Sequence, residues 1–203
     1  MERDNRMINR FNDYDTVKGY SDFERLPKGG YIMRVMGASI GYGNTGNQYV
    51  KISCDIAEGE HAGYFANAYK ANTNENKKWT CNYILSVPAD DGSEKDGWTK
   101  RRFKTVIEAF EASNDGYHFD WNETKMKGLL IGGLINEREY EGSDGTIRRA
   151  SNLAQLVAVD KIRTGNYKLP DDRLLKSDNT VPAVNDGFMT IPDGAEVDGL
   201  PFA

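Results

Sequence analysis

The sequence predicts a mainly β domain with one main helix, and three observations support that class. Aromatic residues make up 11% of the 203 residues, and the 21 glycines are concentrated in turn-like clusters. Residues 49–56 alternate between apolar and polar, which is the period of a half-buried strand. Residues 99–113 carry apolar residues at helical spacing. A sheet packed against one main helix accounts for all three.

Residues 28–69 are the stretch on which this class depends, and we expect three successive strands there. The first covers 31–42, because Gly29 and Gly30 open it and Pro27 blocks a helix; a turn cluster at 41–46 ends it. The second covers 49–56. It should place Val50, Ile52, Cys54 and Ile56 on a core face, and Tyr49, Lys51, Ser53 and Asp55 on a solvent face. The Ala-rich stretch 61–71 should form the third.

The next elements are a short added strand and the main helix. We expect the strand at 80–87, closed by Pro88, and a loop over 89–97. The helix should run over 99–113 with Thr99 as its N-cap. Its apolar stripe consists of Phe103, Val106, Ile107 and Phe110.

A second short helix and a hairpin should complete the domain. Asp120 can cap the short helix, with Glu123 three residues later and Gly128 as its stop. A strand over 128–140, a turn at 142–145 and a return strand over 146–162 follow.

This order of elements is that of an OB-fold barrel, so we predict a five-stranded OB-fold-like barrel with an extra short strand. The main helix would lie between the third and fourth barrel strands. An SH3-like barrel would lack that helix, and a ferredoxin-like fold would begin strand–helix–strand. The predicted organisation is an N-terminal arm (1–27), the barrel domain (28–164) and a disordered acidic tail (165–203).

The charge of the chain is concentrated in the tail. The net charge is −5, and the segment 177–203 contains no Lys or Arg, so residues 1–176 sum to zero. The acids of the segment are Asp178, Asp186, Asp193, Glu196 and Asp198. Two cysteines do not make a disulfide framework, and we expect Cys54 to be a buried thiol in a reducing compartment. With no signal peptide and no apolar run of membrane length, we expect a cytoplasmic protein that does not enter a membrane.

The sequence gives little indication of catalysis. Only two histidines are present, and the motifs of zinc, nucleotide-hydrolysing and serine enzymes are missing. Asp55, Glu58 and Glu60 suggest metal ligands of a nuclease, but Glu58 and Glu60 flank Gly59 in a turn, where solvated acids are common. We therefore expect no catalytic residue, no metal and no cofactor.

Several groups of aromatic and basic residues instead suggest a surface for single-stranded nucleic acid, which needs rings for bases and cations for phosphates. The first is Tyr49 with Lys51 on the solvent face of the second strand. The second is the start of the main helix, where cations oppose the helix dipole unless they bind phosphate. The predicted nucleic-acid-binding residues are Tyr49, Lys51, Lys77, Lys78, Trp79, Trp98, Lys100, Arg101, Arg102, Arg148 and Arg149.

The chain ends in Leu200, Pro201 and Phe202, followed by Ala203. An apolar tip on an acidic tether can enter a pocket of a protein partner. This tip resembles the partner-docking end of bacterial single-stranded DNA-binding proteins. Here the terminal carboxylate is displaced by one residue. We predict that Leu200, Pro201 and Phe202 bind a replication or recombination protein.

Three segments carry a wider resemblance. They are NRFNDYDTVKGYSDFERLPKGGYIMRVMGA, ISCDIAEGEHAGYF and DDGSEKDGWTKRRFKTVIEAFEASNDGYHFDWNETKMKGLLIG. Over residues 9–170 the chain resembles largely uncharacterised proteins of phages and integrative elements of Gram-positive bacteria, some of them labelled single-stranded DNA-binding. The resemblance implies an accessory role in replication or recombination and assigns no catalytic residue.

The leading hypothesis is therefore a non-catalytic protein that binds single-stranded DNA during replication or recombination of a phage or mobile element. The alternative is a protein-interaction adaptor or inhibitor with the same barrel and no DNA affinity. A metal-dependent nuclease is the third hypothesis. Homo-oligomerisation is compatible with all three.

Overall fold

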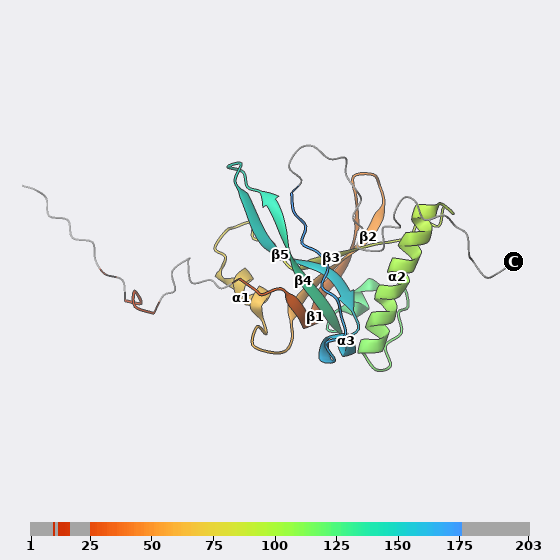
Figure 1. Ribbon diagram of the computed structural model, residues 1–203, viewed down its shortest axis with the longest axis horizontal. Helices are drawn as coiled ribbons and strands as arrows, with labels where there is room; N and C mark the ends of the chain where they lie inside the picture. The colour runs from red at the N-terminus through yellow and green to blue at the C-terminus, as the bar shows by residue number, and fades with distance from the viewer. Residues whose placement is uncertain (1–9, 11, 17–24, 176–203) are drawn as a thin grey trace, which may run out of the picture.

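The computed structural model describes residues 10, 12–16 and 25–175 (Figure 1). Five strands form one antiparallel sheet: β1 (Gly29–Tyr42), β2 (Gln48–Ile56), β3 (Asn82–Ser86), β4 (Leu130–Glu141) and β5 (Ile147–Val157). The helices are α1 (Tyr64–Ala71), α2 (Glu94–Ser113), the 3₁₀ helix η2 (Glu123–Met126) and α3 (Val159–Arg163). No helix in this part of the chain is long and apolar enough to cross a membrane.

The strands follow the order β3-β2-β1-β4-β5, and the sheet is open. Hydrogen-bonded pairing does not join β3 to β5 within the described residues, where a five-stranded OB-fold-like barrel was predicted. Cα atoms of these two edge strands nevertheless approach within 8 Å, and α2 packs against β3, β4 and β5. The helix therefore covers the region where the sheet fails to close (Figure 1).

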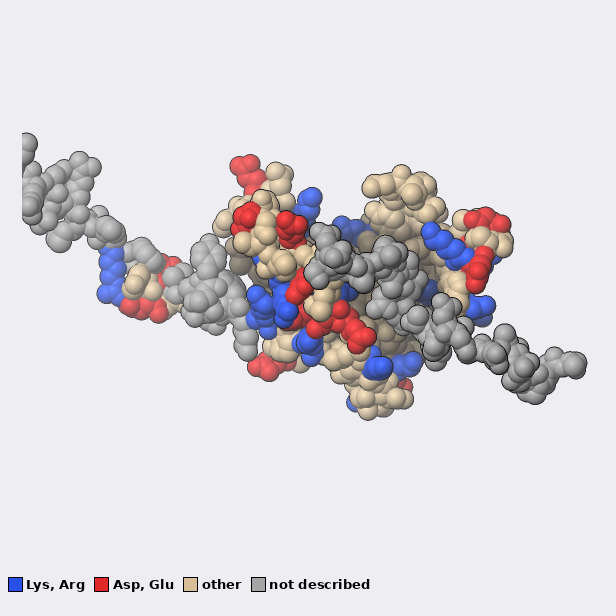
Figure 2. All heavy atoms as spheres, turned by 45° about the horizontal axis from the view of Figure 1, so that its top comes forward, with Lys and Arg blue, Asp and Glu red and all other residues tan. Residues whose placement is uncertain are grey.

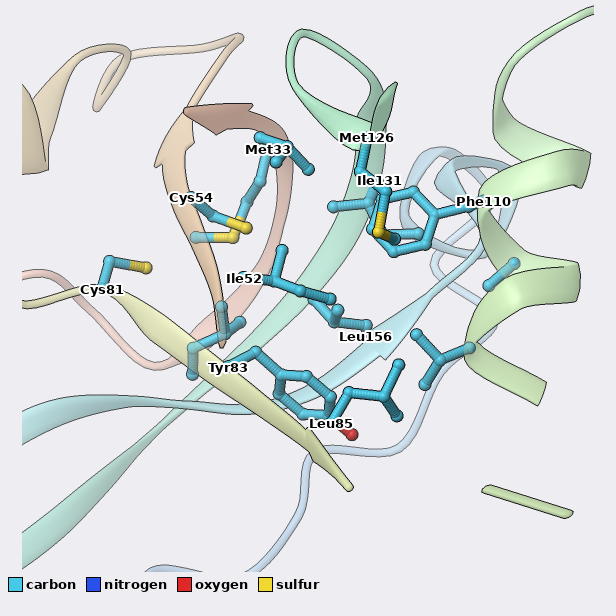
Figure 3. Packing of buried hydrophobic residues seen from close by; sticks show 14 of the residues in the cluster. Met33, Ile52, Cys54, Cys81, Tyr83, Leu85, Phe110, Met126, Ile131 and Leu156 are labelled. Atoms are coloured by element: carbon cyan, nitrogen blue, oxygen red, sulfur yellow. The ribbon is translucent and has the colours of Figure 1, made fainter. Parts of the chain in front are cut away.

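The core lies between the concave face of the sheet and α2. Phe110 of α2 points toward Met33, Ile52, Ile131 and Leu156 from four strands (Figure 3). The predicted core face of β2 is confirmed, because Val50, Ile52, Cys54 and Ile56 are all buried. Burial raises the pKa of the Cys54 thiol to about 12, as expected for an inert core cysteine.

The predicted third strand over 61–71 is wrong, because this stretch forms α1. Gly63 precedes the helix with φ 75°, and Asp55 at the end of β2 binds its first turn. Ala has the highest helix propensity, so the Ala-rich sequence suits a helix once the acid caps it. The stretch 80–87, predicted as an extra strand, instead supplies β3, so five strands remain.

The predicted start of the main helix at Thr99 is also wrong. α2 begins at Glu94, and the Ser93 hydroxyl caps it by accepting from the Asp96 amide at 3.1 Å. Its buried side chains include the predicted Phe103, Val106 and Phe110. Glu94 and Asp96 occupy the first turn and match the helix dipole.

Two further boundaries differ from prediction. The short helix is η2, and its cap is Asn122 rather than Asp120. The return strand ends at Val157 instead of Ile162, and the chain turns into α3. The turn at 142–145 is confirmed by hydrogen bonds from the Gly142 amide to the Thr146 carbonyl and from the Gly145 amide to the Gly142 carbonyl.

The body extends beyond the predicted boundary at residue 164. The backbone of Arg173 pairs in parallel with β4, donating to the Glu137 carbonyl and accepting from the Glu139 amide. Asp172 forms a 2.8 Å ion pair with Lys28, which lowers the pKa of the carboxyl. Residues 165–175 are thus a strap on the domain, and the remainder of the predicted tail lies outside the described residues.

Candidate nucleic-acid interface

The convex face of the sheet is divided into covered and uncovered parts. α3 and Tyr167 cover the part formed by β1 and β4, where they lie close to Gly30 and Gly132. α1 covers the end of β2 at Asp55. The remaining part, here called the open sheet face, consists of Ser39, Gly41, Tyr49, Lys51, Ser53, Asn82, Ile84 and Ser86.

Tyr49 lies flat at one end of the open sheet face. It pairs with Gly41 across β1, and a Cβ atom at Gly41 would lie only 2.5 Å from Tyr49 Cζ. The phenol ring therefore rests on the glycine backbone. Its opposite side is turned away from the sheet, in the orientation that base stacking requires.

Lys51 lies at the centre of the open sheet face, opposite Ser39 on β1 and Ile84 on β3. Its side chain is exposed, and no ion pair involves it in the part of the chain that the structure describes. None of the residues of the open sheet face is acidic, although the chain contains 31 acids. A phosphate would meet a cation and hydroxyl groups there, without a competing carboxylate.

Trp79 and Lys77 lie beside the other end of the open sheet face. Ser53 donates to Asn82 Oδ1 at 2.7 Å, and Asn82 Nδ2 donates to the Trp79 carbonyl at 2.7 Å. The Trp79 indole is half-buried, and its Nε1 donates to the Cys54 carbonyl. Lys77 lies 4.8 Å from the ring centre of Tyr69, which in turn contacts Trp79. Trp79 therefore holds this border together, while Lys77 and the exposed Lys78 offer charge.

Asp55 is buried, although the alternation of β2 placed it on the solvent face. Its carboxylate accepts from the amides of Ile56 and Phe65 at 2.9 Å and of Ala66 at 3.2 Å. These bonds use the carboxylate as a helix cap. The described residues contain no group of three or more His, Cys, Asp or Glu placed to hold a metal ion.

The expected conflict between Lys100 and the helix dipole is absent, because Lys100 lies beyond the first turn of α2. It binds Asp90 and forms a 2.9 Å ion pair with the buried Asp96. Asp90 and then Asp96 raise the pKa of Lys100. Asp96 also accepts from the amides of Ala89 and Asp90, so this cluster fixes the loop before α2.

The other predicted residues of α2 form two separate pairs. Arg101 lies 5.2 Å from the ring centre of the exposed Trp98. Arg102 donates to the hydroxyl of the buried Tyr83 at 3.1 Å. Tyr83 belongs to the concave face, so these α2 residues do not join the open sheet face.

Arg148 and Arg149 project from the β4–β5 hairpin, and acids neutralise both. Arg148 pairs with Asp144 at 2.6 Å, and Arg149 pairs with Glu139 at 2.9 Å. The structure thus separates the predicted basic residues into distinct sites. The predicted partner-binding residues Leu200, Pro201 and Phe202 lie outside the described residues.

The sequence reasoning missed Ile84 and Arg34. Ile84 is 46% exposed beside Lys51, and alternation of the short β3 could have indicated its position. Arg34 is exposed on β1 and donates to the Gly128 carbonyl at 3.2 Å. A bulge at Met36 shifts the alternation of β1, so the side on which Arg34 lies could not be read from its spacing to Ser39.

Comparisons with known proteins leave the function to be argued from this geometry. No protein-family model matches the chain, and no curated protein matches it.

Proposed function

We propose that this chain is a non-catalytic single-stranded DNA-binding protein that acts in replication or recombination of a phage or mobile element. The observation that carries the proposal is the open sheet face, which combines the Tyr49 ring, the free Lys51 ammonium and hydroxyl groups without an acid. Stacking on rings and attraction of phosphates to cations are the two interactions that single strands use.

The order of the elements supports the proposal. An OB-fold is a partly open five-stranded barrel that binds oligonucleotides on the face of its second and third strands. Here β1, β2 and β3 form a meander, β1 pairs with β4, and α2 falls between β3 and β4. An OB-like domain is therefore the architecture we propose, with the open sheet face as its binding surface.

Titration of a fluorescent dT oligomer by the full chain, followed by anisotropy, tests the proposal. Tyr49→Ala should weaken binding by about tenfold, the lower part of the 1–3 kcal/mol range for a base stack. Lys51→Gln should weaken it by a similar factor, because it removes the cation that contacts phosphate. The logarithm of the binding constant should fall with the logarithm of salt concentration by about 0.7 per phosphate contact.

Lys161→Gln is the matched control, because Lys161 is exposed on α3, which covers another part of the same convex face. It removes one charge and should leave the affinity within twofold. If Lys51→Gln and Lys161→Gln lowered the affinity for DNA equally, the protein would attract DNA only through its overall charge and not at the open sheet face. No binding by the wild-type chain even at low salt would reject the proposal.

One observation favours the alternative of a protein-interaction adaptor or inhibitor. Residues 35–50 contain no charged residue, and the β1–β2 hairpin forms an uncharged lobe (Figure 2). Ile40 and Tyr42 are 47% and 69% exposed on it. Charge-poor aromatic surfaces are typical of protein interfaces. The double variant Ile40→Ser, Tyr42→Ser should leave the affinity for DNA intact. If this variant lost binding to a protein partner while it bound DNA like the wild type, the hairpin would be a protein-binding surface.

A further inference from the structure

Outside the open sheet face, an aromatic platform lies on α2 and consists of Phe103, Phe119 and Trp121. Trp121 is 80% exposed and stacks on Phe103, with ring centres 6.0 Å apart and planes 8° apart. Phe119 contacts both rings at 5.7 and 6.0 Å. The Phe119 amide donates to Glu111 on α2, which fixes the loop that carries the platform. One side of the indole is therefore backed by Phe103, and the other is open.

The backbone at Trp121 indicates that this arrangement is held at a cost. Its φ is 65°, and among the described residues Asp90 is the other non-glycine residue with positive φ. Bulky residues rarely adopt this region, and such strain clusters at binding sites. One side of the Trp121 indole covers Phe103, which is 7% exposed, and the open side has no such structural role.

The segment that follows Trp121 carries cations as well as Glu123. Lys125 and Lys127 follow Trp121 within six residues and are exposed. Lys125 pairs with Asp120, whereas no ion pair involves Lys127 among the residues that the structure describes. Gly128, the next residue, accepts from Arg34 of β1. A flat ring on a segment with exposed cations suits a nucleic-acid base with its phosphates better than an aliphatic protein surface.

We propose that the open side of Trp121 is a second stacking site for single-stranded DNA, with Lys127 and Arg34 contacting the flanking phosphates. The inference rests on the proposed function, and it adds a base-binding residue outside the open sheet face. A strand long enough to occupy both places contacts Tyr49 and Trp121 together, whereas a short strand occupies one of them.

Intrinsic fluorescence of the full chain provides the test. The chain has three tryptophans, so Trp98→Phe keeps the emission of Trp79 and Trp121, and Trp121→Phe keeps that of Trp79 and Trp98. Addition of a long dT oligomer should quench the Trp98→Phe protein and protect it from acrylamide. The same oligomer should change the Trp121→Phe protein much less.

Affinity separates base stacking from a purely structural role. Trp121→Leu should weaken binding of the long oligomer by about tenfold, and Trp121→Phe should restore most of the affinity because a phenyl ring still stacks. Tyr42→Leu is the matched control, because Tyr42 is an exposed aromatic residue of the β1–β2 hairpin, and it should leave the affinity unchanged. Binding of an oligomer of about five nucleotides should respond to Tyr49→Ala more than to Trp121→Leu.

The outcomes distinguish this inference from the proposed function. Tight binding of DNA with unchanged Trp121 emission, and wild-type affinity in Trp121→Leu, would overturn the second stacking site and leave the open sheet face intact. The platform would then be free for a protein partner. Failure of the wild-type chain to bind DNA of any length would overturn both.

Discussion

The convex face of the sheet has a covered half and an open half, and glycine residues serve a different purpose in each. In the covered half, α3 and Tyr167 approach the strands so closely that a Cβ atom at Gly30 would lie 2.7 Å from Tyr167 Cζ. In the open half, Gly41 supports the Tyr49 ring, and Lys51 extends into solvent. Glycine admits another chain segment in the first half and a single aromatic side chain in the second.

The difference shows how the fold leaves the open sheet face accessible to a ligand. A convex face without cover exposes its side chains to solvent, and this chain covers β1 and β4 with α3 and the end of β2 with α1. What remains open carries a ring, a cation and hydroxyl groups instead of large aliphatic side chains, apart from Ile84. Changes in the covered half should therefore reduce stability, and changes in the open half should reduce binding.

Gly132→Ala should give the largest effect, on the covered half. The new Cβ atom would lie 2.6 Å from Ile162 Cγ1 and 2.9 Å from the Val157 carbonyl oxygen, and the backbone atom cannot easily move. Overpacking of this kind costs about 2–3 kcal/mol of unfolding free energy. Urea denaturation should detect it as a lower midpoint.

Gly37→Ala is the matched control, since no heavy atom lies within 4 Å of the added Cβ atom and the backbone is not left-handed. It should be neutral or should stabilise by up to about 1 kcal/mol, because alanine restricts the unfolded chain. Equal destabilisation by both changes would mean that Ile162 of α3 does not pack on the sheet at Gly132 as described.

Asp55→Ala should have the next largest effect, at the border that α1 covers. The change leaves the amides of Ile56, Phe65 and Ala66 without their acceptor. Loss of a helix cap costs about 1–2 kcal/mol, and the amides of α1 should exchange hydrogen faster. Lys51→Ala on the same strand should change neither property.

A nuclease centred on Asp55 makes a different prediction for a second variant of this residue. Asp55→Asn retains one acceptor oxygen and should restore part of the stability. If Asp55→Asn abolished a magnesium-dependent cleavage of the oligomer while keeping the fold, the acid would be catalytic rather than structural.

The alternation of β2 was enough to find the centre of the candidate site. Tyr49 and Lys51 could be placed on one face of the strand because strand periodicity is local. Gly30 lies on the same convex face of β1, yet α3 and Tyr167 cover it from more than 130 residues away. Periodicity assigns a residue to a side of the sheet, but coverage is a tertiary property.

The helix α1 and the basic residues of α2 show the same limit. The aromatic residues of 61–71 favour a strand locally, and the long-range cap from Asp55 favours the helix. Lys100 could be placed in the first turn only as long as the helix began at Thr99. The signal for the earlier start is Ser93 followed by acids, SEKD, which the turn-forming residues around it obscure.

Gly41→Ala should have a smaller effect and should sharpen the role of the open half. The added Cβ atom would lie within 2.7 Å of two ring carbons and the hydroxyl oxygen of Tyr49, so the ring must rotate away while remaining present. We expect affinity for dT to fall about fivefold, part of the energy of one base stack, with little loss of stability. Gly43→Ala in the same hairpin, whose nearest contact is 3.7 Å, should bind normally. Equal affinities of the two variants would mean that the plane of the Tyr49 ring is irrelevant.

Removal of residues 177–203 should have the smallest effect, and one that depends on salt. The segment carries the whole net charge of −5 and follows in sequence the strap of residues 165–175, whose Arg173 pairs with β4. A tethered acidic segment reaches an effective concentration on the order of millimolar and competes with DNA for Lys51. The truncated chain should therefore bind dT about two- to threefold more tightly at low salt, and the gain should shrink as salt screens the attraction.

Phe202→Ala separates the charge of that segment from its apolar tip. It should leave the affinity for DNA unchanged and weaken binding to a replication or recombination protein that recognises Leu200, Pro201 and Phe202. Combining the truncation with Lys51→Gln should remove most of the gain, since the competing acids and the phosphates then lack their shared cation. A gain that persists in Lys51→Gln would place the competition elsewhere, with Lys127 beside Trp121 as the next residue to change. If the truncated chain bound DNA and protein partners as the full chain does, the segment would contribute to neither kind of binding.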